Sequence, residues 1–270
     1  MTSQHITIGS THIPRIGLGT YKITGPGAAK DVADAISIGY RHIDTARMYE
    51  NEAEVGRGIR DSGVPRSEIF LTTKVWPSDF RNLIPAVEDS LRRLQMERVD
   101  LLLLHWPSDP ESNKIAVAEL NEVLKRGYAQ SVGVSNFTIA QLEDARKDAP
   151  IICDQVEYHP YLSQAKLLAY LRSYDMALTA YRPLALGRVT QDPVLLDIAA
   201  AHKKTAGQVT LRWLVQQDDV AVIPKTTHRE RLIENFNIFD FELTEAEMKA
   251  IDDLPKNERL TNPATAPEWD

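Results

Sequence analysis

Short apolar runs of the kind that form strands recur along this chain, and amphipathic stretches separate almost all of them. The eight runs lie near residues 17, 42, 71, 101, 131, 152, 178 and 220. Alternating strand and helix patterns indicate βαβ units, and eight units in about 250 residues suit a closed barrel. We therefore predict an α/β fold, a (β/α)8 TIM barrel that occupies residues 1–270 as one domain.

The pattern also predicts where most elements begin and end. Alternation around Gly9 and Ser10 predicts an N-terminal β-hairpin that closes one end of the barrel. The barrel strands with the clearest limits are expected at 16–20, 131–135, 151–157, 177–181 and 220–224. Helices are expected at 28–39, 52–60, 82–95, 114–126, 193–204, 208–217, 229–235 and 245–252. The last four of these helices include extra ones before and after strand eight.

Polar residues mark the ends of three successive predicted strands. Asp44 ends the second strand and leads to Tyr49, Lys74 ends the third, and His105 ends the fourth. Barrel enzymes carry their chemistry at the C-terminal ends of the strands and in the loops that follow. The sequence therefore predicts that four groups able to handle a proton converge on one mouth of the barrel.

These residue types suggest a division of roles. A phenol has a pKa near 10, and a neighbouring ammonium can lower it by about 1 to 3 units, so we expect Lys74 to make Tyr49 a better acid. A buried lysine needs a partner, and Asp44 is the expected one. His105 is expected to donate a hydrogen bond to a substrate oxygen. The alternatives are a structural ion pair, a core tyrosine and a satisfied core histidine.

Composition and net charge limit the classes of partner that we expect this chain to bind. With 270 residues and 43% hydrophobic content the chain can bury a large core, and its net charge of −7 disfavours nucleic acids and anionic membranes. Cys153 is the single cysteine, so no intrachain disulfide is possible. The first residues lack the pattern of a secretion signal, and no apolar run is long enough to span a bilayer. We expect a cytoplasmic monomer that acts on a small molecule.

Metal and phosphate motifs are mostly missing. The chain has no cysteine cluster and no helical histidine pair, so we expect no metal site. Gly17 and Gly19 lack the third glycine of a Rossmann fingerprint, and no Walker A motif occurs. Lys225, Thr226 and Arg231 follow strand eight, where many barrels hold a phosphate at a helix N-terminus. A solvated, charged helix start is the equal alternative.

Eight segments together resemble the aldo-keto reductase superfamily in order and spacing. They are GLGTY, YRHIDTARMYENEAEVG, TTKVW, LLLLHWP, GVSNF, DQVEYHPYL, TAYRPLALG and IPKTTHRERLIEN, and they run from Ile16 to about Asn235. The short loop after Trp106 and the short C-terminal tail resemble those of bacterial members that are similar to 2,5-diketo-gluconate reductases. The resemblance implies a (β/α)8 barrel that binds NADPH without a Rossmann domain and reduces aldehydes or ketones to alcohols.

The resemblance also implies roles for individual residues. The catalytic tetrad would be Asp44, Tyr49, Lys74 and His105, with Tyr49 as the general acid. Residues implied at the nicotinamide end of the cofactor are Asp44, Ser135, Asn136, Gln155 and Tyr181, the last stacked on the ring. Residues implied elsewhere along the cofactor are Gly19, Thr20, Tyr21, Arg182, Leu184, Lys225, Thr226, Arg231, Glu234 and Asn235. The substrate pocket would be formed by Tyr21, Trp76, His105 and Trp106.

Some positions depart from the family pattern, and two other functions stay open. Arg182 stands where many relatives have serine, and we expect it to reach a phosphate. The loop after Trp106 and the C-terminal tail are short. Glycoside hydrolysis would need two carboxylates, for which Asp44 and Glu157 are the candidates. A regulatory relative that binds nucleotide without turnover is the second alternative.

Overall fold

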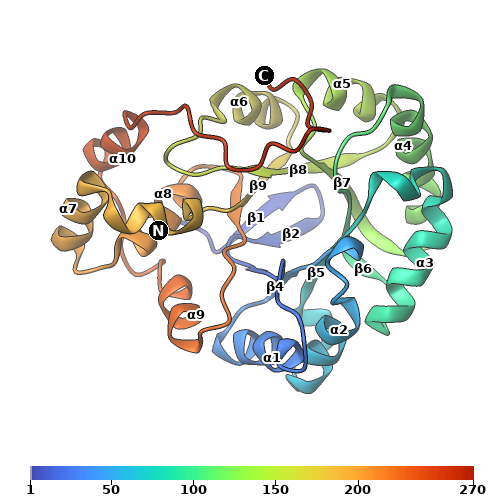
Figure 1. Cartoon of the computed structure of the whole chain (residues 1–270), viewed down its shortest axis with the longest axis horizontal. Helices are drawn as coiled ribbons and strands as arrows, with labels where there is room; N and C mark the ends of the chain where they lie inside the picture. Colours follow the sequence, from blue (N-terminus) through green and yellow to red (C-terminus); the bar gives the residue numbers. More distant parts are fainter. Residues whose placement is uncertain (1) are drawn as a thin grey trace.

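Residues 2–270, which the computed structural model describes, form a ring of eight parallel strands surrounded by helices (Figure 1). Neighbours along the chain are neighbours in the sheet, from β3 to β10. The strands are β3 (Leu18–Gly19), β4 (His42–Asp44), β5 (Phe70–Val75), β6 (Val99–Leu104), β7 (Ala129–Ser135), β8 (Ile151–Glu157), β9 (Ala177–Tyr181) and β10 (Val220–Val222). The predicted barrel is confirmed, with first and last strands shorter than expected.

The ring closes between its first and last strands. Ile16 forms a parallel bridge with Val222, and the Gly17 amide donates to the Val222 carbonyl at 2.8 Å. The Gly19 amide donates to the Pro224 carbonyl at 3.1 Å. A Cβ atom at Gly19 would lie 2.6 Å from the Ile223 carbonyl oxygen. Position 19 therefore needs glycine for barrel closure, whatever else it contacts.

The predicted hairpin is present as β1 (His5–Ile8) and β2 (Thr11–Pro14), which pair antiparallel. Ile6, Ile8 and Ile13 are buried against apolar side chains of the barrel strands in one cluster. The Thr11 and Ser131 hydroxyls share a hydrogen bond of 2.7 Å. The hairpin lies across the opening of the ring in Figure 1 and closes the end opposite the strand C-termini.

Ten α-helices cover the barrel within the described residues. They are α1 (Ala28–Ile38), α2 (Glu52–Asp61), α3 (Leu83–Leu94), α4 (Pro110–Lys125), α5 (Ile139–Asp148), α6 (Ala165–Ser173), α7 (Pro193–His202), α8 (Ala206–Gln216), α9 (Arg229–Phe236) and α10 (Glu245–Asp252). The extra helices around the last strand are confirmed. Helix α4 starts earlier than predicted, because the Asp109 side chain caps it and Pro110 occupies its first turn. Helices α5 and α6 fall outside the predicted ranges.

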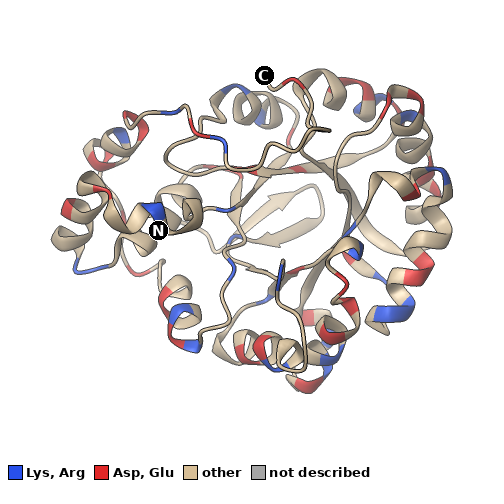
Figure 2. Cartoon of the chain, in the orientation of Figure 1, with Lys and Arg blue, Asp and Glu red and all other residues tan. Residues whose placement is uncertain are grey.

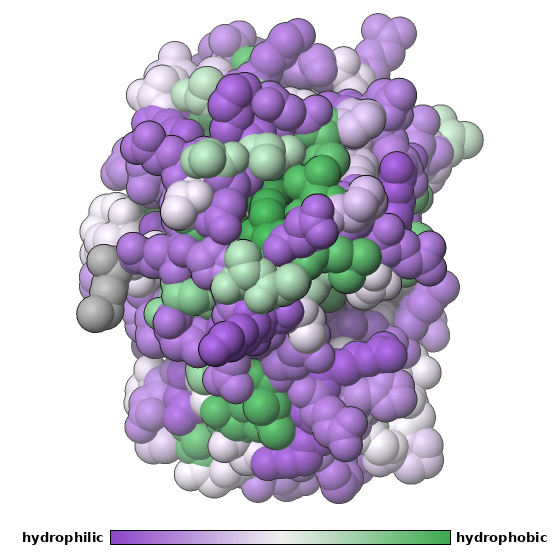
Figure 3. Space-filling view, turned by 90° about the vertical axis from the view of Figure 1, so that its left-hand side faces the viewer, coloured by the Kyte–Doolittle hydropathy of each residue, from purple (hydrophilic) through white to green (hydrophobic). Residues whose placement is uncertain are grey.

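Charged side chains gather on the outer helices, while the strands of the ring carry few (Figure 2). The face that carries α7 and α10 is mostly hydrophilic, with apolar patches lying between polar side chains (Figure 3). Apolar residues of the helices pack against the strands in one large buried cluster. No helix in residues 2–270 is both long enough and apolar enough to cross a membrane.

The packing of α2 on α3 yields a stability prediction. A Cβ atom at Gly56 in α2 would lie 2.0 Å from the Leu94 carbonyl oxygen at the end of α3. Overpacking of this kind costs about 1–3 kcal/mol, whereas helix propensity alone favours alanine. We expect Gly56→Ala to lower the free energy of unfolding in urea titrations. Gly27→Ala is the control, since a Cβ atom at Gly27 would have no neighbouring atom within 4 Å; equal midpoints for both variants would contradict the prediction.

Candidate active site

The four proton-handling residues of the sequence come together at the C-terminal mouth of the barrel. Asp44 is the last residue of β4, Lys74 lies near the end of β5, and His105 follows β6 directly. Tyr49 ends a short 3-10 helix, η1 (Arg47–Tyr49), that follows β4. Three adjacent parallel strands thus present these groups at one edge of the sheet, and the loop after β4 folds back to add Tyr49.

Lys74 is the centre of the cluster. Its Nζ donates to Asp44 Oδ1 at 2.5 Å, to the Thr45 carbonyl at 2.8 Å and to Tyr49 Oη at 3.4 Å. The Lys74 and Asp44 side chains are 0% and 1% exposed. Burial lowers the pKa of Lys74, and the Asp44 carboxylate opposes that change. The ammonium is buried away from solvent and is therefore stabilised by its three oxygen partners in the protein.

The pKa of Tyr49 differs from our expectation. Burial raises the pKa of its phenol well above the ordinary value, and the Asp44 carboxylate adds to this rise. The expected lowering of the pKa by Lys74 is wrong for the protein by itself, because burial outweighs it and the Asp44 carboxylate acts in the same direction as burial. The Tyr49 hydroxyl therefore keeps its proton at neutral pH. The Lys74 ammonium remains in contact with the oxygen where negative charge appears when that proton leaves.

His105 completes the cluster as a neutral imidazole. Burial, followed by the Lys74 charge, lowers the pKa of His105 well below its ordinary value. Its ring stands edge-on to Tyr49, with centroids 5.5 Å apart, and edge-on to Trp76 at 5.1 Å. The buried Nδ1 atom has no hydrogen-bond partner among residues 2–270. A buried polar atom without a partner is costly, so the site can gain stability from a polar ligand.

The side chains expected at a carboxamide form one network beside the tetrad. Gln155 Nε2 donates to Asp44 Oδ2 at 2.8 Å, and Ser135 Oγ donates to the Gln155 carbonyl at 2.7 Å. Asn136 Nδ2 donates to Ser135 Oγ at 3.0 Å, while Asn136 Oδ1 accepts from Tyr181 Oη at 2.7 Å. The structure thus brings these four candidates together and links them to Asp44.

Gly19 ends the first barrel strand, and Thr20 and Tyr21 follow it at the same mouth. Thr20 is buried, and within the described chain its Oγ1 atom has no hydrogen-bond partner. The Tyr21 ring is 43% exposed and lies 5.1 Å from the Tyr49 ring between centroids. This segment therefore offers a second polar atom without a partner, next to an exposed aromatic ring.

The candidates for the adenosine end lie on α9 and the segment before it. They are Lys225, Thr226, Arg231, Glu234 and Asn235. Lys225 and Arg231 are exposed, and neither forms an ion pair in the part of the chain that the structure describes. Glu234 accepts a hydrogen bond from the Thr205 hydroxyl at 2.6 Å. Two exposed cations thus flank the start of a helix.

Arg182 forms a contact with the C-terminal tail that the sequence did not predict. It follows β9 with a φ of 50°, and its Nη1 donates to the Leu260 carbonyl in the C-terminal tail at 3.0 Å. This contact accounts for Arg182 without a phosphate. Leu184 directly precedes the 3-10 helix η4 (Ala185–Gln191) and packs against the core.

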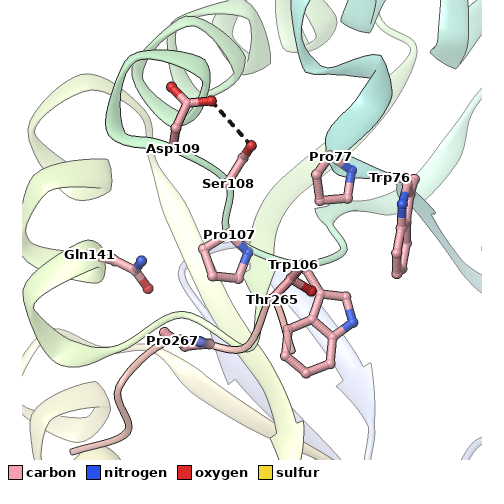
Figure 4. Close-up of a pocket in the computed structure, with 9 residues that line it drawn as sticks. All are labelled: Trp76, Pro77, Trp106, Pro107, Ser108, Asp109, Gln141, Thr265 and Pro267. Atoms are coloured by element: carbon pink, nitrogen blue, oxygen red, sulfur yellow. Dashed lines mark hydrogen bonds between the residues drawn. The ribbon is translucent and has the colours of Figure 1, made fainter. Parts of the chain in front are cut away.

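A cavity of about 350 Å³ lies next to Trp76, whose ring centroid is 5.1 Å from that of His105. None of the four tetrad residues is part of its lining. Its lining residues are Trp76, Pro77, Trp106, Pro107, Ser108, Asp109, Gln141, Thr265 and Pro267, which come from two barrel loops, α5 and the tail (Figure 4). The predicted walls Trp76 and Trp106 are present, whereas Tyr21 and His105 are not part of this lining. Gln141 and the tail residues were missed individually, because no local pattern places them opposite the tryptophans.

Glu157 does not act as the second carboxylate of a glycosidase. Its two oxygens accept hydrogen bonds from the Leu260 and Thr261 amides, both at 2.6 Å, and from His159 Nε2 at 2.9 Å. The group is fully buried and committed to the tail. No cluster of His, Cys, Asp or Glu within residues 2–270 is arranged to hold a metal ion.

Comparison with known proteins agrees with this geometry. The family model for the aldo/keto reductase family matches residues 15–256. The glyoxal reductase of Bacillus subtilis is 44% identical over 253 residues, 92% of this chain and 91% of that protein. The methylglyoxal reductase DkgB of Escherichia coli O157:H7 is 39% identical over 268 residues, 96% and 99% of the two chains.

A solved structure assigned as a 2,5-diketo-D-gluconic acid reductase B has 46% sequence identity and a TM-score of 0.96, covering 100% of this chain and 98% of that one. The aldose reductase of Schistosoma japonicum has 32% identity and a TM-score of 0.90, covering 98% and 96%. These relatives are named as reductases, and the family generally uses nicotinamide cofactors. With a family model over most of its length and such relatives end to end, the chain belongs to the aldo/keto reductase family of oxidoreductases.

Proposed function

We propose that this protein uses NADPH to reduce the carbonyl group of small aldehydes or ketones, with Tyr49 as the general acid. The observation that carries the proposal is the contact of 3.4 Å between Tyr49 Oη and the buried Lys74 ammonium, beside a neutral His105. A proton donor, a stabilising cation and a neutral hydrogen-bond donor thus surround one point at the barrel mouth.

The residues at the mouth fit a nicotinamide cofactor. The unpartnered Thr20 Oγ1 and His105 Nδ1 atoms show that polar groups remain unsatisfied without a ligand. Ser135, Asn136 and Gln155 offer amide and hydroxyl groups that suit a carboxamide, and Tyr181 offers an aromatic ring. When bound, NADPH supplies the hydride that adds to the carbonyl carbon.

The side chains of the tetrad then manage the charge that develops on oxygen. Tyr49 donates its proton to the carbonyl oxygen, and its raised pKa ensures that it holds this proton beforehand. Lys74 stabilises the phenolate that results, and Asp44 holds Lys74 in place. His105, being neutral, donates a hydrogen bond from its ring to the same oxygen without placing a second cation beside Lys74.

The cations near α9 support NADPH rather than NADH. An acidic residue is the usual partner of a free ribose 2′-hydroxyl, whereas Lys and Arg suit a 2′-phosphate. Lys225 and Arg231 are exposed and have no ion pair within the described chain. Thr226 lies between them near the helix start and adds a hydroxyl.

The cavity supports small uncharged substrates. Within residues 2–270 its lining includes two tryptophans and one acidic residue, Asp109, but no Lys, Arg or His. A carboxylate placed there would meet a like charge and no cation. The names of the relatives, glyoxal and methylglyoxal reductase, fit such substrates. We therefore propose α-dicarbonyls such as methylglyoxal as the preferred class, ahead of keto acids.

Replacement of Tyr49 by phenylalanine tests the acid. Loss of the proton donor should reduce kcat for methylglyoxal reduction by roughly 10²–10⁴-fold, while quenching of protein fluorescence by NADPH is retained. The control is Tyr174→Phe, which removes a hydroxyl from an exposed tyrosine outside the site. Equal rates for Tyr49→Phe and wild type would remove Tyr49 from the mechanism. Absence of turnover in the wild type would favour the regulatory alternative.

Replacement of Lys225 and Arg231 by alanine tests the cofactor preference. Each cation that binds a phosphate should contribute about 1.5–3 kcal/mol, so KM for NADPH should rise at least about tenfold per variant. KM for NADH should hardly change, because it lacks the 2′-phosphate. Lys147→Ala, which removes an exposed lysine side chain on α5, serves as the control. Equal losses with both cofactors would show that these residues do not contact the 2′-phosphate.

The lowered pKa of His105 predicts the pH dependence of reduction. A depressed pKa means that the imidazole stays neutral as the pH falls through the ordinary histidine value. With NADPH saturating, kcat should therefore stay constant from pH 8 down to about pH 6. Activity should fall only at more acidic pH, when protonation adds a cation beside Lys74. An inflection near pH 6.5 in the kcat profile would contradict this assignment.

A further inference from the structure

The C-terminal tail, residues 254–270, crosses the barrel mouth between α10 and α5 (Figure 1). It begins with contacts to the loop after β8, where Lys256 Nζ donates to the Pro160 carbonyl and the Glu258 amide donates to the Tyr161 carbonyl at 3.0 Å. It ends where Asp270 Oδ2 accepts from the Ile139 amide at 3.0 Å, at the start of α5. Both ends of the tail are therefore attached to the barrel.

Two charged side chains hold the middle of the tail by hydrogen bonds to its backbone. Arg182 Nη1 donates to the Leu260 carbonyl at 3.0 Å, and Glu157 accepts from the Leu260 and Thr261 amides at 2.6 Å each. Burial disfavours the charge of Glu157, but hydrogen bonds from His159 and the two tail amides keep its pKa below the ordinary value. We call Arg182 and Glu157 the tail clasp. Charge-assisted hydrogen bonds of this kind are among the stronger ones.

The segment beyond the clasp forms one wall of the cavity. Thr265 and Pro267 line it together with Trp106. The Trp269 ring packs between the Arg259 guanidinium, 3.7 Å from its centroid, and the Trp106 ring at 6.1 Å. A shift of the tail at residues 259–261 would therefore move Trp269 and the cavity wall together. The tetrad is held by separate contacts and would stay in place.

We propose that Arg182 and Glu157 are positioning residues for substrate, which act by fixing the tail that forms one wall of the cavity. The inference rests on the proposed function, because it assigns the cavity to the carbonyl substrate. Arg182 directly follows Tyr181, the residue proposed to stack on the nicotinamide. The clasp thus ties the substrate wall to the strand that carries this ring. A serine at position 182, the residue that the family pattern favours, is too short to make the same contact.

The test compares Arg182→Ser and Arg182→Lys with the wild type. We expect Arg182→Ser to raise KM for methylglyoxal about five- to thirtyfold, with kcat and the Kd for NADPH each changing less than about twofold. Lysine keeps a cation and a donor, so Arg182→Lys should recover part of the loss. Amide hydrogen exchange of residues 260–269 should accelerate in the serine variant and leave the barrel strands unchanged. Glu157→Gln should act in the same direction.

A double variant locates the effect in the tail. If the clasp works through Trp269, the KM increases caused by Arg182→Ser and Trp269→Ala should be far from additive in the combined variant. Arg126→Ser removes an exposed arginine on the outside of the barrel and should change neither KM nor tail exchange.

Two outcomes would overturn the proposal. A weaker NADPH Kd with unchanged tail exchange would return Arg182 to the phosphate role expected from the sequence. Unchanged KM and unchanged exchange would show that the clasp does not position the wall. The exchange measurement needs no turnover, so it separates failure of the clasp from failure of the proposed reduction, which would appear as an inactive wild type.

Discussion

A lysine ammonium that is buried away from solvent at the mouth of a barrel needs oxygen atoms of the protein itself as hydrogen-bond partners. This constraint determines the arrangement of the site. Lys74 meets it with Asp44, the Thr45 carbonyl and the Tyr49 hydroxyl. Asp44 in turn accepts a hydrogen bond from Gln155, and Ser135 and Asn136 belong to the same network. The position of each of these side chains depends on the buried charge.

Burial, followed by the charges of Lys74 and Asp44, also sets the protonation states of His105 and Tyr49. A second cation beside Lys74 is unfavourable, which together with burial keeps His105 neutral. A second anion beside Asp44 is equally unfavourable, which together with burial keeps Tyr49 protonated. At neutral pH the site therefore contains a protonated phenol, which can donate its proton, and a neutral imidazole. In the proposed mechanism, Tyr49 is made an effective acid by stabilisation of the phenolate as it forms, rather than by a low pKa before the reaction.

The sequence predicts the parts of this arrangement that depend on chain order. Strand periodicity locates β8 and β9 to the residue, and the rule that parallel strands share an edge brings Asp44, Lys74 and His105 together. It does not predict effects that depend on packing between distant segments. The pKa of Tyr49 follows from burial, which a strand pattern does not measure. The partner of Arg182 is Leu260, 78 residues further along the chain, and no local signal links the two.

The barrel and the tail differ in how tightly their positions are determined. Asp44, Lys74 and His105 lie on a strand or directly after one, so their positions follow from the closed sheet. Tyr49 is added by the short helix η1 that follows β4. The cavity wall formed by the tail depends instead on a few side chains that hold an irregular segment by hydrogen bonds, such as Glu157 at the end of β8. Substitutions in the tail can therefore change the shape of the cavity while the proton-transfer geometry stays constant. Under the proposed function, one barrel mouth can in this way accept different carbonyl compounds while the geometry of the acid Tyr49 stays the same.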